Sequence, residues 1–383
     1  MPSFRKVVLL HIIVVFLLTL IPMKGHAFSN VSAETAILMD VESGRVLYEK
    51  AAHKKMRIAS ITKIMTAILA IESDMLDETV KVSERAVYTE GSSVYLKQGE
   101  KIKLEHLVYG LMLRSGNDTA VAIAEHVGGS VEGFVFLMNQ KAEEIGMHNT
   151  VFANPHGLDD HENHFSTAYD MALLTKYAMG NEKYREIAGT KVYRAPNPDE
   201  KWDRKWTNKN KLLTGLYEYS TGGKTGYTKR AKRTLVSTAA KDGHDLIAVT
   251  LNGPSDWNDH IAMFEWGFAQ YDLESIVEKG LVHSIKDDFY KEKVVVQRDF
   301  LYPITAEEKE KIKVDIKLIK PKPQWKKEKD VPSPCGKMII KLEDQNIGEI
   351  PLYYDEHGRI HKETWLSTMK RLFLSMIGVY ANG

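Results

Sequence analysis

Apolar and polar residues alternate in two short stretches near the start of the chain, residues 36–40 and 45–50, which are separated by a turn at 42–44. Alternation with a period of two is typical of strands, so the pattern predicts an N-terminal β-hairpin. From residue 60 to about 190 the apolar residues recur at helical spacing instead. The first helical stripe consists of Ile61, Ile64, Met65 and Ile68. The sequence therefore predicts a helical block after the hairpin.

Strand-like alternation returns later in the chain. Residues 233–240 and 245–252 alternate on either side of the turn at 241–244, and an amphipathic helix follows at 260–271. Strands at both ends of a helical block favour one antiparallel sheet that brings the two ends of the domain together. We therefore predict an α+β domain over residues 28–275.

Beyond residue 275 the helical stripes stop and alternating segments take over. They cover residues 294–296, 312–318 and 337–354, with a break at Pro321 and Pro323. This composition predicts a small all-β second domain over residues 276–360. The alternative is a β extension that packs into the first domain.

The two ends of the chain carry their own apolar segments. Residues 1–27 combine basic residues, an apolar run and a small-x-Ala ending, which predicts a signal peptide cleaved after Ala27. An uncleaved membrane anchor is the alternative, and in both cases the rest of the chain is exported. Residues 361–383 have apolar residues at helical spacing with basic residues opposite, which predicts an amphipathic helix lying on the membrane surface. A helix docked on the β domain is the alternative.

Composition narrows the classes of function. The chain has 383 residues, of which 43% are hydrophobic and 27% charged, and its formal net charge is +1. That charge gives no general attraction to nucleic acid, and no basic motif interleaved with aromatics is present, so we expect no nucleic-acid partner. Cys335 is the only cysteine, which excludes an internal disulfide and argues against a Cys nucleophile or a Cys-ligated metal.

The candidate chemistry begins at Ser60 and Lys63, which stand three residues apart at the start of the first helical stretch. On a helix this spacing places both side chains on one face, so the amine can reach the hydroxyl. A serine hydroxyl becomes a good nucleophile only when a neighbouring base takes its proton. The spacing alone is weak evidence, because Ser367 and Lys370 share it. Lysine can act as that base if burial or a nearby cation lowers its pKa.

Two further tripeptides complete a pattern. Residues 115–117 are Ser-Gly-Asn, and residues 224–226 are Lys-Thr-Gly just ahead of a predicted strand. In the order S-x-x-K, S-x-N, K-T-G, these are the three-part signature of serine penicillin-recognising enzymes. We therefore expect Ser60 to be the nucleophile and Lys63 the general base.

Residue chemistry suggests roles for the other members of the signature. Ser115 can pass a proton to the leaving amine, and Asn117 can bind the substrate amide and orient Lys63. Lys224 and Thr225 offer a cation and a hydroxyl to a substrate carboxylate. Gly226 lets an extended peptide approach the strand edge, and the backbone N–H groups of Ser60 and Tyr227 are expected to form the oxyanion hole.

These motifs give the chain a specific resemblance. Together with "NPHGLDD", they resemble a D-alanyl-D-alanine carboxypeptidase of the low-molecular-weight penicillin-binding protein class, closest to the sporulation-type enzyme of spore-forming Gram-positive bacteria. The resemblance implies a β-lactamase/transpeptidase-like catalytic domain and an enzyme that removes the terminal D-alanine from the peptidoglycan pentapeptide. It also implies inhibition by β-lactams and no cofactor. Tyr227 stands where some members have His, which bears on fine specificity.

The resemblance also predicts a location. An exported enzyme of this class is expected at the outer face of the cytoplasmic membrane or in the cell wall, or at the forespore outer membrane for a sporulation-type enzyme. It would act in cell-wall or spore-cortex maturation.

A second polar cluster lies in "HGLDDHENH", at residues 156–164. Its members with potential ligand atoms are His156, Asp159, Asp160, His161, Glu162 and His164. Their spacing does not match a standard zinc motif, so we predict a polar loop without a metal. Ser166 or Thr167 is then expected to cap the following helix.

Three rival functions differ in what they require of the sequence. A class A-type β-lactamase would add a glutamate for deacylation, and no E-x-x-L-N stretch lies between Ser115 and Lys224. A D,D-endopeptidase would use the same acylation chemistry, so the sequence does not separate it from a carboxypeptidase. A wall-binding scaffold would require the loss of a signature residue, and all of them are present.

Overall fold

The computed structural model describes residues 31–197, 200–325 and 327–355. The predicted signal peptide and the predicted C-terminal helix lie outside these residues. The described residues form two compact units. The first unit comprises residues up to 39, 46–239 and 246–267, and the second comprises 40–45, 240–245 and 268 onward.

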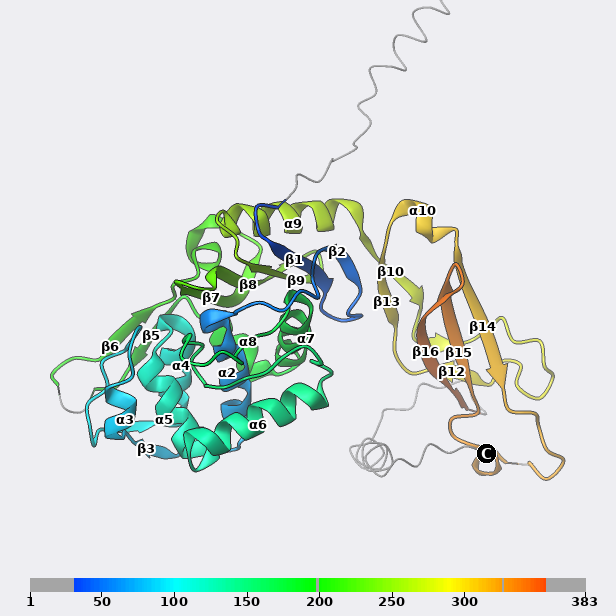
Figure 1. Ribbon diagram of the computed structural model, residues 1–383. Coiled ribbons are helices and arrows are strands. Elements are labelled where there is room, and N and C mark those ends of the chain that lie inside the picture. The colour runs from blue at the N-terminus through cyan, green and yellow to red at the C-terminus, as the bar shows by residue number, and fades with distance from the viewer. Residues whose placement is uncertain (1–30, 198–199, 326, 356–383) are drawn as a thin grey trace, which may run out of the picture. The chain divides into compact units, whose positions relative to one another are not determined.

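The first unit is built on a five-stranded sheet with the strand order β2-β1-β9-β8-β7 (Figure 1). Its strands are β1 (Thr35–Asp40), β2 (Val46–Lys50), β7 (Ser220–Thr228), β8 (Lys232–Lys241) and β9 (His244–Leu251). Strand β1 pairs antiparallel with β2 and lies beside β9, so strands from both ends of the unit share one sheet. The N-terminal hairpin and the β8–β9 hairpin confirm the predicted alternation. Strand β7, at the sheet edge, was not predicted from the pattern.

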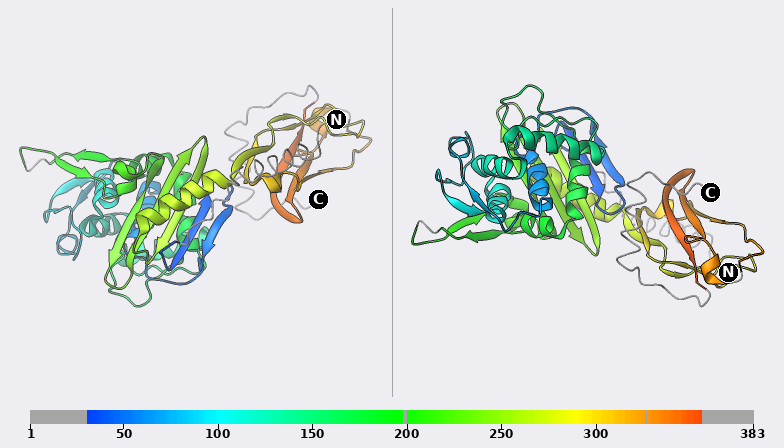
Figure 2. Two further views of the ribbon diagram at one scale, coloured as in Figure 1. Left: turned by 90° about the horizontal axis from the view of Figure 1, so that it is seen from above. Right: turned by 90° about the horizontal axis from the view of Figure 1, so that it is seen from below.

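Helices cover both faces of this sheet. Helix α9 (Asp256–Gln270) lies across one face, and the helical block lies on the other (Figures 1 and 2). The helices of the block are α2 (Lys63–Glu72), α3 (Glu84–Val87), α4 (Leu104–Arg114), α5 (Asn117–Gly128), α6 (Val131–Glu144), α7 (Ala168–Met179) and α8 (Glu182–Ala188). Helix α2 packs against α4, α5, α6, α7 and α8. A helix that is apolar nearly all round must be buried, and this burial fixes α2 at the centre of the block.

The block also contains elements that its helical pattern does not predict. Two antiparallel pairs join β3 (Thr79–Lys81) to β4 (Lys101–Lys103) and β5 (Val192–Ala195) to β6 (Arg204–Thr207). A π-helical turn, η2, covers Leu212–Leu216. Runs of three or four residues are too short for a period of two to stand out from a helical stripe.

The second unit is largely β-structure. Strand β10 (Asp272–Val277) pairs with β13 (Phe300–Ile304), and a five-stranded sheet has the order β11-β12-β16-β15-β14. The strands of that sheet are β11 (Gly280–Leu281), β12 (Val294–Val296), β14 (Ile312–Leu318), β15 (Gly336–Leu342) and β16 (Gln345–Tyr354). Two short helices complete the unit, α10 (Ala306–Lys309) and the 3₁₀ turn η3 (Glu328–Asp330).

The apolar core of this second unit includes Tyr290, Val294, Ile340 and Leu352. Cys335 is buried in the same core, where its Sγ lies 3.3 Å from the carbonyl oxygen of Leu352. The limit proposed from the sequence between residues 275 and 276 falls inside β10. That limit stays a prediction.

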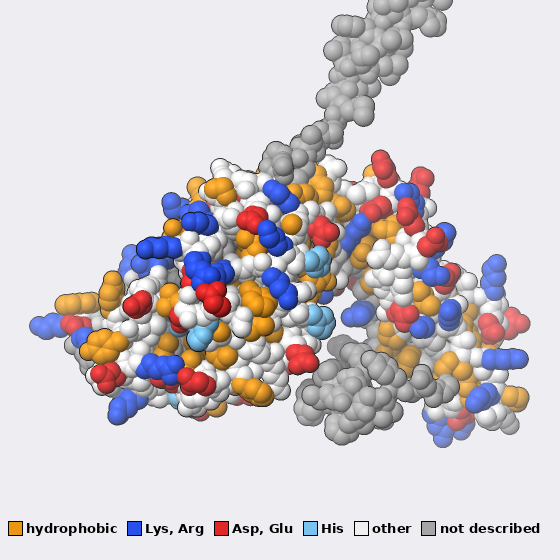
Figure 3. Space-filling model, viewed as in Figure 1, with side chains coloured by type: hydrophobic (Ala, Val, Ile, Leu, Met, Phe, Trp, Pro, Cys, Tyr) orange, Lys and Arg blue, Asp and Glu red, His pale blue; other side chains and the backbone are white. Residues whose placement is uncertain are grey.

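Charged side chains of both signs are interspersed on the face of each unit that Figure 3 shows. Among the described residues, no single helix has both the length and the apolar character needed to cross a bilayer. Helices α5 and α6 meet that test only as a pair, and they are bent by 84° at their junction.

One buried histidine ties α9 to the sheet. His260 is fully buried, with Nδ1 2.6 Å from Ser237 Oγ on β8 and Nε2 2.9 Å from Thr250 Oγ1 on β9. Burial lowers the pKa of His260 to about 3, because a charged imidazole would lose its hydration there. The folded state therefore holds this ring neutral.

We expect the free energy of unfolding to fall as the pH drops from about 6.5 towards 4. His260 binds a proton in the unfolded chain below a pKa of about 6.5 but stays neutral in the fold, which costs about 2 to 3 kcal/mol by pH 4.5. Urea unfolding at neutral and acidic pH would measure the loss, and His260→Gln, which does not titrate, should lose less. An equal loss in both proteins would contradict this account.

Candidate active site

Ser60 lies in a 3₁₀ turn, η1 (Ala59–Thr62), and the α-helix begins only at Lys63. The sequence placed Ser60 at the start of the helix itself, so the helix start is corrected by three residues. The contact survives the change, because side chains at i and i+3 eclipse one another in a 3₁₀ turn. Lys63 Nζ lies 3.1 Å from Ser60 Oγ.

Lys63 is completely buried, and its amine has three oxygen neighbours. Besides Ser60 Oγ, Nζ lies 2.7 Å from Asn117 Oδ1 and 2.6 Å from the carbonyl oxygen of His156. Burial, followed by the nearby charges of Lys224 and Lys209, lowers the pKa of Lys63 well below its usual value. A neutral amine has two N–H donors and one lone pair. It can donate to Asn117 and His156 while accepting the proton of Ser60.

A second serine–lysine pair faces the first. Ser115 ends α4 in the left-handed conformation, with φ of 64°, and so turns towards β7. Lys224 Nζ donates to Ser115 Oγ at 3.0 Å and to the carbonyl oxygen of Thr225 at 2.6 Å. Burial, followed by the charge of Lys209, lowers the pKa of Lys224 to about 7. The pair therefore places an exchangeable proton between α4 and β7.

Asn117 is held in place by the chain segment before β4. It is the first residue of α5, and its Nδ2 donates to the carbonyl oxygen of Glu90 at 2.5 Å. The neighbouring Asp118 carboxylate accepts from Ser93 Oγ at 2.6 Å and from the N–H of Val94 at 3.0 Å. These bonds fix the side-chain amide, so that Oδ1 stays directed at Lys63.

The third tripeptide lies inside strand β7 at the edge of the sheet. A Cβ added to Gly226 would lie 2.4 Å from Thr234 Oγ1 and 2.9 Å from the backbone nitrogen of Ser60, so only glycine fits. The next residue, Tyr227, has 63% of its surface exposed. The backbone nitrogen of Ser60 thus lies close to Gly226 in strand β7. One edge of β7 pairs with β8, and in the described part of the chain no strand pairs with the other.

The loop at residues 154–158 belongs to the site through its backbone carbonyl oxygens. The sequence motifs did not indicate this contribution. The carbonyl oxygen of Pro155 accepts from Thr66 Oγ1 at 2.6 Å, next to the contact between His156 and Lys63. Gly157 has φ of +88°, and a Cβ there would lie 1.9 Å from the carbonyl oxygen of Ala59. Only glycine allows this loop to close against the turn that carries Ser60.

Lys209 is a second residue that the motifs did not indicate. Its Nζ lies 3.3 Å from Ser92 Oγ, and its charge contributes to lowering the pKa of both Lys63 and Lys224. No sequence pattern links residue 209 to the other two. Only the folded chain brings the three lysines together.

The polar cluster at residues 156–164 forms hydrogen bonds and ion pairs within the loop and with its neighbours. Glu162 pairs with Arg57 and Arg230, each at 2.7 Å. His164 Nδ1 accepts from the N–H of Ala153 at 3.0 Å, which places its proton on Nε2, 2.9 Å from Thr62 Oγ1. Burial lowers the pKa of His164 to about 4. In the described residues, no group of three or more His, Cys, Asp or Glu is arranged to hold a metal.

Of the two residues predicted to cap the helix after this loop, Ser166 and Thr167, only Thr167 does so. Thr167 Oγ1 accepts from the N–H of Asp170 at the start of α7, and Ser166 does not act as the cap. Ser166 instead hydrogen-bonds Thr150 Oγ1 at 2.7 Å.

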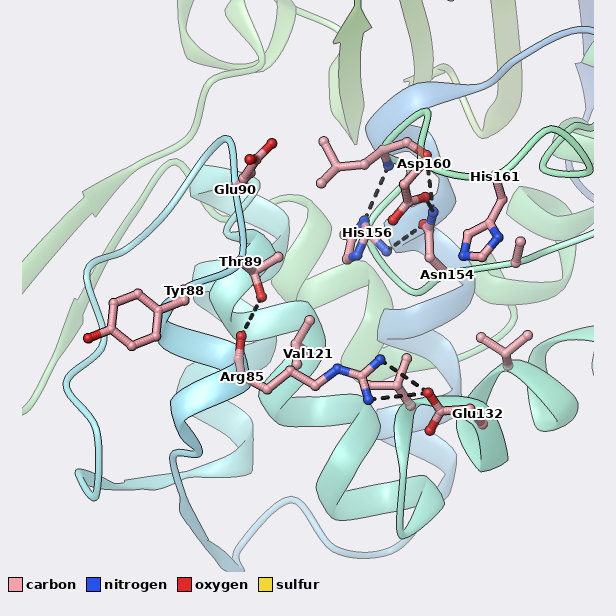
Figure 4. Close-up of a pocket in the computed structure, with 14 residues that line it drawn as sticks. Arg85, Tyr88, Thr89, Glu90, Val121, Glu132, Asn154, His156, Asp160 and His161 are labelled. Carbon is pink, nitrogen blue, oxygen red and sulfur yellow. Dashed lines mark hydrogen bonds and ion pairs between the residues drawn. The ribbon is translucent and has the colours of Figure 1, made fainter.

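A cavity of about 690 Å³, drawn in Figure 4, adjoins the site through His156, and Ser60 is not among its lining residues. Its walls come from the end of α3, from α5 and α6 and from the loop at residues 153–161, and none of the eight predicted site residues lines it. His156 is shared, because its side chain lines the cavity while its carbonyl oxygen contacts Lys63. Its Nδ1 accepts from the N–H of Leu158 at 3.2 Å, and burial lowers the pKa of His156 to about 3.

Comparison with known proteins identifies the family. The family Peptidase_S11, described as D-alanyl-D-alanine carboxypeptidase, matches residues 23–255, and the C-terminal domain of penicillin-binding protein 5 matches residues 271–357. The chain belongs to the D-alanyl-D-alanine carboxypeptidase family. The family membership and the fold class expected from the resemblance are confirmed.

Individual relatives support this membership. The chain is 36% identical over 257 residues to the D-alanyl-D-alanine carboxypeptidase DacF of Bacillus subtilis, covering 65% of each chain. It is 38% identical over 262 residues to DacC of Escherichia coli, covering 62% of each. The matches thus span somewhat less than two thirds of these relatives. Penicillin-binding protein 5 of Haemophilus influenzae is similar in structure, with a TM-score of 0.68 and 26% identity over 85% of this chain and 97% of that one.

We expect Gly157→Ala to lower the free energy of unfolding by about 3 kcal/mol or more, because its methyl group would add a clash with Ala59 to an unfavourable φ. Gly99 is the matched control, since it also has a positive φ but no atom within 4 Å of a Cβ. Gly99→Ala should cost only about 1 to 2 kcal/mol. Chemical unfolding of both variants would measure the difference, and equal losses would contradict the contact with Ala59.

Proposed function

We propose that this chain is a serine-type D-Ala-D-Ala carboxypeptidase, which removes the terminal D-alanine from peptidoglycan pentapeptides. The observation that carries the proposal is the contact between Ser60 Oγ and the buried amine of Lys63, whose pKa is lowered. A serine next to a buried neutral lysine is an activated nucleophile, because the amine can take its proton. The family supplies the substrate class.

Acylation follows from the geometry. Ser60 Oγ attacks the carbonyl carbon of the penultimate D-alanine while its proton passes to Lys63 Nζ. The oxyanion of the tetrahedral intermediate accepts hydrogen bonds from the backbone N–H groups of Ser60 and Tyr227. Ser115, whose hydroxyl accepts a hydrogen bond from Lys224, then passes its proton to the leaving nitrogen and receives the proton that Lys63 took from Ser60, so Lys63 is neutral again and Lys224 keeps its charge. The C–N bond breaks, free D-alanine leaves, and an ester remains on Ser60.

Substrate recognition uses the edge of β7. The peptide lies along this edge as an added strand, and Gly226 allows the close approach. The ammonium of Lys224 and the hydroxyl of Thr225 bind the terminal carboxylate. Asn117 binds the substrate amide through its side chain and keeps Lys63 in place.

Deacylation transfers the acyl group to water, with Lys63 as the base that activates it. A β-lactam acylates Ser60 in the same way, but its leaving group stays attached and the ester persists. Because no E-x-x-L-N stretch is present between the second and third motifs, we expect the β-lactam adduct to hydrolyse slowly, as in a target enzyme rather than a β-lactamase. Cross-linked peptides cleaved by the same steps would make the chain a D,D-endopeptidase.

The same proposal covers location and domain organisation. We place the signal peptide at residues 1–27, the catalytic domain at 28–275, the β domain at 276–360 and a membrane-surface helix at 361–383. The enzyme would then work outside the cytoplasmic membrane on the wall, or on the spore cortex. The sporulation-type assignment rests on the resemblance of the motifs.

Ser60→Ala should reduce release of D-alanine from a diacyl-L-Lys-D-Ala-D-Ala peptide by about a thousandfold or more, because the nucleophile is gone. Ser367→Ala is the matched control, since Ser367 and Lys370 have the same spacing. It should keep full activity. Equal activity of Ser60→Ala and the wild-type chain, with folding intact, would contradict the proposed nucleophile.

The rate of acylation should be bell-shaped in pH. It rises as Lys63 loses its proton, and it falls above about pH 7 as Lys224 loses the charge that binds the carboxylate. Measuring kcat/KM from about pH 5 to about pH 9 tests both limbs. A substrate ending in D-alaninamide is the control, because it has no carboxylate and should not show the alkaline limb. An alkaline limb unchanged by the amide would assign that limb to another group.

A further inference from the structure

The outer face of the sheet in the second unit carries an unfavourable arrangement of charges. In the pairing of β14 with β15, Lys313 is opposite Lys341 and Lys317 is opposite Lys337. Like charges directly opposite one another destabilise an antiparallel pair. The two lysine pairs therefore do not help to stabilise the sheet, which suggests that these lysines serve another purpose.

Carboxylates compensate only part of this charge. Asp315 lies 2.8 Å from Lys341 Nζ, and on β16 Glu349 Oε2 lies 2.9 Å from Lys337 Nζ. Neither of these ion pairs includes Lys313 or Lys317, both of which are exposed. Asp315 also interacts electrostatically with Lys313 and Lys317, and Asp344 with Lys341, so four lysines share three carboxylates and keep one net positive charge. Two more exposed lysines, Lys320 and Lys322, follow the end of β14.

The lysines are not required for the core of the unit. The alternate residues of the same strands, among them Ile316, Met338, Ile340 and Ile350, face the apolar cluster. Alternation along a strand places the lysines on the opposite side. We call this side, defined by Lys313, Lys317, Lys337 and Lys341, the lysine face.

The chain leaves the unit at one end of the lysine face. Leu318 is opposite Gly336, and Gly336 is opposite Leu352, so the end of β16 lies at the same end of the sheet as Lys317 and Lys337. The described part of the chain therefore ends at the same end of the sheet as these lysines. Residues 356–383 contain four Lys or Arg and two Glu, so their charge does not complement the lysine face.

We propose that the lysine face binds the anionic headgroups of a lipid bilayer. The proposal rests on the membrane-surface helix proposed above, which would hold the chain at the bilayer from the adjoining end of the sheet. Charge complementarity supports it, because a lysine close to an anionic leaflet adds attraction that falls off within a Debye length. The helix then supplies insertion, and the lysine face supplies preference for anionic lipid.

The test compares three full mature chains, each starting at Phe28. These are the wild type, Lys313→Gln/Lys317→Gln, and the matched control Lys205→Gln/Lys211→Gln, whose lysines are exposed on the first unit. Co-sedimentation uses vesicles of neutral phosphatidylcholine and vesicles with about 30% phosphatidylglycerol. The chosen lysines form none of the described ion pairs of the face, so the double variant should fold. Its unfolding temperature should equal or slightly exceed that of the wild type, because one lysine of each like-charged pair is gone, and its D-alanine release should match the wild type.

The wild type and the control should bind the anionic vesicles about tenfold more tightly than Lys313→Gln/Lys317→Gln, and high salt should remove that difference. All three should bind neutral vesicles equally. If the double variant prefers anionic over neutral vesicles as strongly as the wild type does, the proposed role of the lysine face is overturned. Absence of binding to neutral vesicles in all three would instead contradict the helix anchor. Loss of binding to soluble poly(glycerol phosphate), with vesicle binding intact, would assign the face to a wall polymer and also overturn the proposal.

Discussion

The buried amine of Lys63 is the constraint on which the rest of the site depends. An ammonium in that position would lose its hydration, and Lys224 and Lys209 add repulsion, so the fold favours the neutral form. A neutral amine can take a proton from Ser60 only if its two N–H groups have other acceptors. Asn117 and the backbone of His156 provide those acceptors.

Contacts from several parts of the fold hold these acceptors in place. Helix α5 begins at Asn117, and the segment around Glu90 fixes the side-chain amide. The loop carrying His156 closes on the 3₁₀ turn because Gly157 has no side chain. The serine–lysine pair, the Asn117 amide and the His156 carbonyl thus come from three separate segments of the chain.

The two lysines of the site have different tasks, and their surroundings give them different pKa values. Burial lowers the pKa of both, but Lys63 is affected by two neighbouring cations and Lys224 by one. Groups whose environments separate their pKa values can serve as base and as charged binder in one pocket. Lys209 contributes to both shifts, and it is the residue that no motif indicated.

The sequence by itself determined the family signature, the N-terminal and β8–β9 hairpins, the helical block and the β character of the second unit. Those features depend on local periodicity and on short spacings such as that from Ser60 to Lys63. Only the tertiary structure decided that β7 is the edge strand, that His156 contributes its carbonyl oxygen, and that Lys209 lies near both catalytic lysines. These facts depend on contacts between segments far apart in the chain, which no local pattern records. The same holds for the lysine face, which depends on the register between β14 and β15.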